Sequence, residues 1–355
     1  MIKTQNINCD SIQPALSICI ATYSRGKFIS QTIDSILSQI SVGVELIVVD
    51  GASPDNTSEV MARYSAHQPN IKYFREPENS GVDGDYDKAV GYANGEYVWL
   101  MTDDDLLLPG AVNRVLNELR VANDLVIVNA EVRSTDLSVL LQRGRLDFKN
   151  DRSYHSNERE AFFAQCGRYL SFIGCVVIRR ELWLTRERTR YYGSLFIHAG
   201  VIFQKPLANS VYVIAEPLIQ IRFGNAMWTP RGFEIWMFKW PQLIWSFHGF
   251  SDHAKQKICP AVPSRSIARL FYYRALGAYG PVEFKKHYHS TTGWIRFGAY
   301  ATSQFPEKLA NLMCALYLGL FKRKALMALY DLSGSRNATR LSRSLARNAI
   351  EMSQK

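Results

Sequence analysis

The first 130 residues alternate short apolar runs with stretches of helical periodicity, and this alternation constrains the fold more than any other feature. The apolar runs cover residues 16–21, 44–49, 71–74, 97–101 and 125–128. Between them, apolar residues recur at the three- and four-residue spacing of a helix that has one buried face. Strands and helices that alternate at this length predict an α/β fold with a mostly parallel sheet, flanked by helices on both faces.

Polar residues follow the first, second and fourth apolar runs, at positions 22–25, 50–53 and 102–105. Open α/β sheets bind ligands beyond the carboxyl ends of their strands. We therefore expect these three segments to converge on one crevice. Ser53 and the proline that follows it also predict that a helix starts there, with the serine as its N-cap.

Asp103, Asp104 and Asp105 are the sharpest chemical signal in the chain. Three adjacent carboxylates repel one another unless a cation compensates them. Mg²⁺ and Mn²⁺ prefer oxygen ligands and are often shared between carboxylates and substrate phosphates. The pattern predicts a divalent metal and a diphosphate at these residues, and the alternative is a polar turn. Asp50 could accept hydrogen bonds from a base or ribose, or it could simply support a turn.

These segments, taken in order, resemble family 2 glycosyltransferases of the GT-A fold. The resemblance rests on LSICIATYSRGKFISQTIDSILSQ (16–39), ELIVVDGASPDNT (45–57), NSG (79–81), ANGEY (93–97) and the triple aspartate. A narrower likeness to abequosyltransferase-type enzymes of O-antigen synthesis extends to about residue 230. It is carried by VVIRRELW, FIHAGVIF and EPLIQIRFGNAMW.

The resemblance implies a nucleotide-sugar donor, a divalent metal (Mg²⁺ or Mn²⁺) and direct displacement with inversion. It also implies a deoxy- or dideoxyhexose and an acceptor oligosaccharide on a lipid diphosphate carrier. Arg222 and Asn225 could contact the diphosphate or the acceptor, or lie in a solvated loop. The residues expected to bind the donor are Thr22, Tyr23, Arg25, Asp50, Ser53, Asp83, Asp103, Arg222 and Asn225.

His198 stands where many relatives carry a catalytic carboxylate. An unperturbed histidine pKa near 6.5 suits a general base that accepts a proton from the acceptor hydroxyl. The alternative is a structural histidine on a buried helix. Asp83 is the second catalytic candidate, with Asp85 and Asp87 as rivals because their spacing suits the same crevice.

Other positions also depart from the family pattern. Tyr86 stands where many relatives have arginine, Asp87 where they have asparagine, and Thr102 where the metal motif usually begins with aspartate. The departure at Thr102 makes Asp104 the best candidate for direct metal ligation. The departures also keep open a non-enzymatic alternative, a degenerate GT-A protein that binds glycan or acts as a scaffold. A sugar-phosphate nucleotidyltransferase is a further alternative, but the sequence at 24–26 is too sparse in glycine for its usual loop.

The C-terminal third is strongly basic. Residues 231–355 hold 19 Lys+Arg and 6 Asp+Glu, a net of +13, whereas residues 1–230 hold 23 and 26, a net of −3. We therefore divide the chain into a GT-A catalytic domain at 1–230 and a basic, aromatic-rich helical region at 231–355. A basic region favours an anionic partner. Helical spacing places one set of cations on one helix face: Arg336, Arg340, Arg343 and Arg347.

With the cations at 322–324, this face predicts contact with an anionic membrane surface, and the alternative is a solvated helix face. No nucleic-acid partner is predicted, because no such binding motif is present. Residues 1–14 lack an apolar signal-peptide core, and no apolar run is long enough to span a bilayer. The six cysteines form no CxxC pair and predict buried free thiols. We expect a cytoplasmic protein, peripheral on the inner face of the cell membrane.

Overall fold

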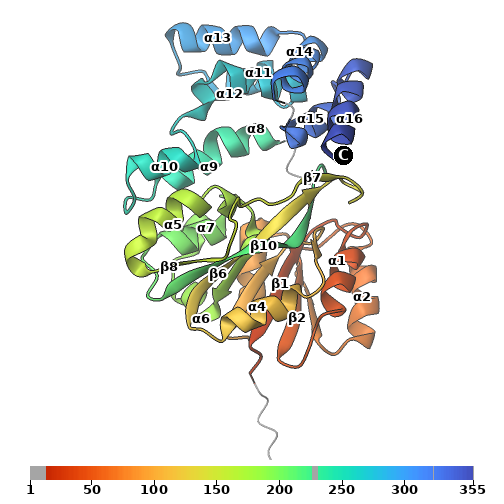
Figure 1. The fold of residues 1–355 in the computed structure, drawn as a ribbon, viewed down its shortest axis with the longest axis vertical. Helices are drawn as coiled ribbons and strands as arrows, with labels where there is room; N and C mark the ends of the chain where they lie inside the picture. Colours follow the sequence, from red (N-terminus) through yellow and green to blue (C-terminus); the bar gives the residue numbers. More distant parts are fainter. Residues whose placement is uncertain (1–12, 226–230, 323, 355) are drawn as a thin grey trace, which may run out of the picture.

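The computed structural model describes residues 13–225, 231–322 and 324–354. A sheet with flanking helices forms one end of the molecule, and a layered group of helices forms the other end (Figure 1). The polar N-terminal segment, Cys9, Arg323 and the predicted boundary at residue 230 lie outside the described residues.

Half of the sheet is parallel and follows the predicted strands closely. Its neighbours run in the order β3 (Ile71–Arg75), β2 (Val44–Asp50), β1 (Leu16–Thr22) and β4 (Tyr97–Met101). The register pairs Thr22 with Asp50, so the first two strands end side by side. Because these strands point the same way, the polar residues that follow them meet at one edge of the sheet.

The other half of the sheet is mixed. β9 (Val176–Arg179) lies antiparallel between β4 and β6 (Asn123–Arg133), and β10 (Ser210–Arg222) then runs parallel to β6. The register of β10 against β6 shifts between Ile214 and Ile219. Three short antiparallel strands complete the sheet: β5 (Leu106–Leu107), β7 (Leu140–Gln142) and β8 (Arg152–Tyr154).

Helices connect the strands, and one of them begins later than predicted. The α-helices of the sheet region are α1 (Ile29–Leu37), α2 (Thr57–His67), α3 (Gly81–Tyr92), α4 (Ala111–Leu119), α5 (Arg159–Cys166), α6 (Arg180–Thr185) and α7 (Ile197–Phe203). The prediction that a helix starts at Ser53 is wrong, because α2 starts at Thr57. The Asp55 carboxylate accepts the Thr57 N–H at 3.1 Å, and the Ser53 hydroxyl instead accepts the Ser24 N–H.

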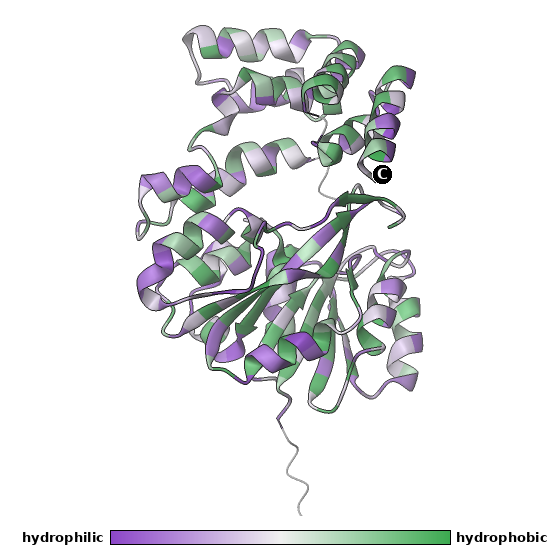
Figure 2. Ribbon diagram, viewed as in Figure 1, coloured by the Kyte–Doolittle hydropathy of each residue, from purple (hydrophilic) through white to green (hydrophobic). Residues whose placement is uncertain are grey.

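The core of the sheet region is built from the strands, which are the most apolar ribbons in Figure 2. Every residue of β2 and β4 is buried. Five cysteines lie in the described part of the chain, all as free thiols. Cys19, Cys166, Cys175 and Cys259 are buried, and Cys314 is partly buried.

Helices continue from residue 232 onward. They are α8 (Gly232–Glu234), a π-helical turn (Ile235–Lys239), α9 (Trp240–Trp245), α10 (Asp252–Ile258), α11 (Ile267–Leu276), α12 (Pro281–His287), α13 (Gly293–Gln304), α14 (Glu307–Phe321), α15 (Leu326–Gly334) and α16 (Arg340–Gln354). Apolar residues of α9 and α10, such as Trp240 and Ile258, join the main core. Later helices form separate clusters around Leu270 and Ala310. Among the described residues, no helix is both long and apolar enough to cross a bilayer.

Candidate functional site

The loops after β1 and β2 interlock at the carboxyl edge of the sheet. The Ser24 N–H donates to the Ser53 hydroxyl at 2.9 Å, and the Gly51 N–H donates to the Thr22 carbonyl at 3.0 Å. Ser24 and Ala52 both adopt positive φ angles, 55° and 59°, which non-glycine residues rarely do. The two segments therefore converge as predicted. Each contributes one residue with a left-handed backbone conformation, Ser24 in the first loop and Ala52 in the second.

Asp50 is fully buried and shapes the second loop. One of its carboxylate oxygens accepts the Ser53 N–H at 2.8 Å, and the other accepts the Tyr73 hydroxyl at 2.7 Å. Arg75 donates to the Ser53 carbonyl at 3.1 Å. Tyr73 and Arg75 were not among the predicted site residues, although β3 is the next parallel strand and ends at the same edge of the sheet.

Asp103 and Asp104 both lie next to the guanidinium of Arg25. Nε of Arg25 lies 3.3 Å from Oδ1 of Asp103, and Nη2 lies 3.4 Å from Oδ2 of Asp104. Burial raises the pKa of Asp103 to about 7, with a further contribution from the Asp104 charge, and Arg25 opposes both. Burial also raises the pKa of Asp104. Two carboxylates with raised pKa values bind a cation strongly only when both carboxylates are deprotonated.

The end of β10 closes the site from the other side. Nδ2 of Asn225 donates to Oδ2 of Asp104 at 2.9 Å, and Arg25 donates to the Asn225 carbonyl at 3.2 Å. Arg222 is buried, and its guanidinium donates to the Asp104 carbonyl, to the Thr135 carbonyl and to the Gln31 side chain. Those bonds fix the backbone of the aspartate loop, so Arg222 orients the loop and is not aimed at a diphosphate.

Asp105 does not join the other two carboxylates. Its Oδ2 accepts the Thr102 hydroxyl at 2.5 Å, and its Oδ1 accepts the Arg222 N–H at 2.7 Å. The geometry therefore does not support the expected role of Asp105 as a metal ligand, because both of its oxygens are engaged within the protein. Across the described ranges, no group of three acidic, histidine or cysteine side chains is arranged to hold an ion.

The crevice nevertheless fits a charged ligand. Within the described residues, the buried Oδ1 of Asn225 has no hydrogen-bond partner. Buried polar atoms without partners are rare in folded proteins and require an explanation. Two carboxylates, a guanidinium and this oxygen suit a divalent cation that is shared with an anionic substrate. Tyr23 follows Thr22 at the rim and is partly exposed.

Asp83 and His198 lie on α3 and α7, and the geometry does not support the catalytic roles expected for them. The Asp83 carboxylate is buried and accepts the N–H groups of Leu195 and Ile197, at 2.8 and 3.0 Å. It therefore fixes the segment that leads into α7. The imidazole of His198 is buried, with Nε2 2.7 Å from the Leu170 carbonyl. Burial lowers its pKa to about 4, so the ring is neutral near pH 7.

The two rival carboxylates differ in their surroundings. Asp87 forms an ion pair with Arg188 and accepts from Trp183 and Tyr192, which is a structural setting. Asp85 instead reaches the crevice, because a Cβ added to Gly51 would lie 2.5 Å from Oδ2 of Asp85. Position 51 requires glycine for this close approach, a contact between positions 34 residues apart that no local sequence pattern predicts.

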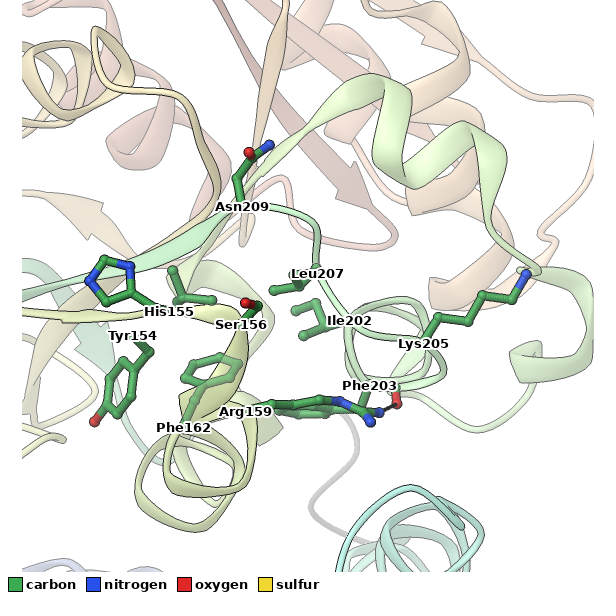
Figure 3. A pocket seen from close by; sticks show the side chains of 11 residues that line it. Tyr154, His155, Ser156, Arg159, Phe162, Ile202, Phe203, Lys205, Leu207 and Asn209 are labelled. Carbon is green, nitrogen blue, oxygen red and sulfur yellow. Dashed lines mark hydrogen bonds between the residues drawn. The ribbon is translucent and has the colours of Figure 1, made fainter.

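A pocket elsewhere in the sheet region is drawn in Figure 3. It lies among β8, α5, α7 and β10, and none of the predicted site residues lines it. Its floor includes Phe162 and Phe203, and Arg159 donates to the Phe203 carbonyl. The pocket is therefore separate from the polar groups gathered at the carboxyl edge of the sheet.

Comparisons with known proteins agree with this geometry. Residues 17–183 match the model of the glycosyl transferase family 2. The abequosyltransferase RfbV of Salmonella typhimurium is 25% identical over 232 residues, which cover 61% of this chain and 69% of that protein. The GalNAc(5)-diNAcBac-PP-undecaprenol beta-1,3-glucosyltransferase of Campylobacter jejuni is 32% identical over 106 residues, which cover 30% of this chain and 34% of that protein.

A crystal structure of residues 1–349 of S. aureus TarS in complex with UDP has a similar fold. The TM-score is 0.51 at 12% identity, and the match covers 96% of this chain and 91% of that one. Identity this low supports the fold alone. The mixed sheet with its flanking helices is a GT-A fold, as the sequence predicted.

Proposed function

This chain belongs to the family 2 glycosyltransferases, and on that premise we propose that it transfers a deoxy- or dideoxyhexose from a nucleotide-sugar donor to an oligosaccharide on a lipid diphosphate carrier. The name of the Salmonella relative supports the sugar class, and that of the Campylobacter relative supports a lipid diphosphate acceptor. Both support a place in O-antigen or surface polysaccharide synthesis. Direct displacement with inversion is part of the proposal.

The observation that carries this proposal is the pairing of Asp103 and Asp104 opposite Arg25 at the carboxyl edge of the sheet. In the adjacent loops, the nucleoside is held by Thr22, Tyr23, Asp50 and Ser53. Arg25 binds the diphosphate. Oδ1 of Asn225 supplies a further polar contact. All of these groups lie where parallel strands end, which is the usual ligand position in such sheets.

Asp103 and Asp104 are the residues that would hold a divalent cation. Bound there, Mg²⁺ or Mn²⁺ would offset the charge that develops on the departing nucleoside diphosphate. Arg25 then exchanges its carboxylate partners for phosphate oxygens, which a guanidinium binds in a bidentate manner. Arg222 holds the aspartate loop in place through the Asp104 carbonyl while this exchange occurs.

Asp83 and His198 act in the proposal as positioning residues. Asp83 fixes the entry to α7, and His198 packs α7 against the Leu170 carbonyl. For His198, this assignment corresponds to the alternative of a structural histidine on a buried helix. In the proposal, the general base that takes the proton from the acceptor hydroxyl is a carboxylate that reaches the crevice. Asp85 is one such carboxylate.

We also propose that the protein works at the cytoplasmic face of the cell membrane. Arg340, Arg343 and Arg347 are exposed on α16 and form the basic surface. Arg336 does not belong to this helical face, because it precedes α16 and donates to the Gly277 carbonyl. A positive surface next to anionic lipid would keep the enzyme near a lipid-linked acceptor.

A thermal-shift screen tests the donor assignment. Purified protein is heated with a panel of nucleoside diphosphates and sugar nucleotides, with and without Mn²⁺. Ligands that bind the native state raise Tm by mass action. We expect a metal-dependent rise with one nucleotide, which would identify the donor base. Folded protein that shows no rise with any nucleotide would instead support a degenerate binding or scaffold protein.

A further inference from the structure

The outward face of α14 is apolar along the whole helix. Its exposed side chains recur at spacings of four, four, three and one residues, which place them on one side of the helix. They are Leu309, Met313, Tyr317, Leu320 and Phe321, the last of these 72% exposed. No charged or amide side chain occurs between residues 312 and 321. A surface helix normally presents a polar outer face, so this one departs from the usual pattern.

The neighbouring helix, α13, exposes aromatic rings. Trp294 is 86% exposed, and Phe297 and Tyr300 follow at three-residue spacing. Trp294 packs edge-to-face on Phe297, at 6.1 Å between ring centroids, so the two rings form one surface cluster. Both helices lie at the end of the molecule away from the sheet (Figure 1). Of 19 large apolar side chains exposed in the described residues, eight fall between positions 294 and 321.

Positive charge surrounds these two apolar faces. Residues 293–355 hold 10 Lys+Arg and 3 Asp+Glu, a net of +7. One of the three acids, Glu307, is paired with Arg274 and Arg336. Lys322 and Lys324 are exposed immediately after the end of α14. α16, which carries the basic surface, packs beside α14, because a Cβ on Gly319 would contact Leu345 at 3.6 Å.

From this arrangement we propose that the outward faces of α13 and α14 insert into the headgroup region of an anionic phospholipid bilayer. Tryptophan and tyrosine favour that region, and aliphatic side chains enter the acyl boundary below it. The inner side of α14 is buried against the protein at Ala310, Asn311 and Ala315. Only the opposite side of the helix is therefore free to contact the bilayer. The lysines after α14 and the arginines of α16 then lie at the depth of the lipid phosphates.

Charge distinguishes a bilayer from a second copy of the chain. Two copies joined through this face would bring two regions of net +7 together, which is unfavourable at low salt. An anionic bilayer is complementary to both the apolar faces and the surrounding cations. The inference deepens the proposed function, because it rests on the membrane location proposed above and names the surface that binds.

Flotation of the full chain with lipid vesicles tests the proposal. Vesicles of phosphatidylcholine with phosphatidylglycerol should bind the wild type, and phosphatidylcholine alone should bind it less. Phe297→Glu and Leu320→Glu should each weaken binding by about tenfold, because each places a charge where an apolar side chain would be buried. Val121→Glu is the matched control, an exposed apolar residue of the sheet region, and should bind as the wild type does.

Lipids with brominated acyl chains give a second measurement. They should quench part of the tryptophan fluorescence of the wild type, and Trp294→Phe should remove most of the quenched signal. Variants that bind as tightly as the wild type, or a wild type that ignores anionic vesicles, would overturn the proposal. So would sedimentation that shows a dimer broken by Phe297→Glu without any vesicle binding.

Donor hydrolysis in solution separates this inference from the proposed function. The α13 and α14 variants should hydrolyse the donor at the wild-type rate, since they lie away from the crevice. Wild-type protein that hydrolyses a donor but ignores vesicles would refute only the membrane surface. Protein that binds vesicles through these helices but never uses a nucleotide sugar would refute only the transferase.

Discussion

The sheet region and the C-terminal helices depart from ordinary packing in opposite ways. The sheet region buries ionisable groups, among them Asp50, Asp104 and Arg25, and its exposed apolar side chains are scattered singly. The helices α13 and α14 instead gather apolar side chains on their outer surface. Each departure is unfavourable for an isolated protein. The contrast is the basis of both proposals: a charged substrate at the sheet edge, and an apolar environment at the helices.

The largest effect should come from the buried carboxylates. We expect Asp104→Asn to lower transfer by about a thousandfold, because it removes charge from the site that balances the diphosphate. The Mn²⁺-dependent thermal shift with nucleotide should disappear. The melting temperature should not fall, since the substitution relieves repulsion with Asp103. Asp147→Asn, at an exposed position of the same region, is the control. Full activity in Asp104→Asn would remove the proposed role of this site.

The same contrast predicts that charge matters differently in the helices. Replacing Arg340, Arg343 and Arg347 together with glutamine should weaken binding to anionic vesicles by about fivefold for each arginine at low salt. Binding should fall further as salt is added to the wild type, because screening acts on the same attraction. Donor hydrolysis should be unaffected. Equal vesicle binding by the triple variant would show that this face of α16 is simply solvated.

A pH titration sharpens the comparison within the sheet region. Burial lowers the pKa of His198 to about 4, whereas the unfolded chain titrates near 6.5. Between these values the unfolded state binds the proton and the folded state does not, so stability falls as pH falls from 6.5 to 4. The effect is up to about 3 kcal/mol. Chemical denaturation of the wild type and of His198→Gln should diverge in this window and run parallel above pH 7.

The smallest effect should separate two glycines, one at the site and one on an exposed part of α3. Gly51→Ala places a Cβ 2.5 Å from the Asp85 carboxylate, so we expect a loss of about 1–3 kcal/mol and weaker nucleotide binding. Gly91→Ala lies within α3 with open space around it and should stabilise the fold by about 0.5–1 kcal/mol. Denaturant midpoints measure both. We expect the two substitutions to change the free energy of unfolding in opposite directions. A stabilised Gly51→Ala variant would show that the close contact between position 51 and the Asp85 carboxylate is not required.

The sequence predicted the parallel half of the sheet well because local patterns decide it. Strands such as β2 and β4 are continuous apolar runs, and their ends fix where the loops meet. The position of β9 was not predictable in this way. A short apolar run carries no sign of direction, and only long-range pairing places it antiparallel between β4 and β6.

The candidate site was predicted by residue type more accurately than by orientation. Asp103, Asp104 and Arg25 do face one another, because their positions follow from strand ends. The Asp105 carboxylate accepts the backbone N–H of Arg222, a contact that joins residues 117 positions apart, and the Arg222 guanidinium donates to the Asp104 carbonyl. His198 lies in an apolar helix, and its burial depends on tertiary packing that no local pattern records. Side-chain direction at such positions is decided by partners that are distant in sequence.

The bond between the Asp105 carboxylate and the Arg222 N–H has a consequence for the order of folding. The strands β1 to β4 can pair as soon as they leave the ribosome, but the aspartate loop cannot be fixed until β10 has been synthesised and has joined β6. Contacts of such long range form late, after the entropy of closing the intervening loop has been overcome. The nascent chain therefore carries three solvated, mutually repelling carboxylates while the next 117 residues are synthesised, and the candidate site is among the last parts of the sheet region to mature.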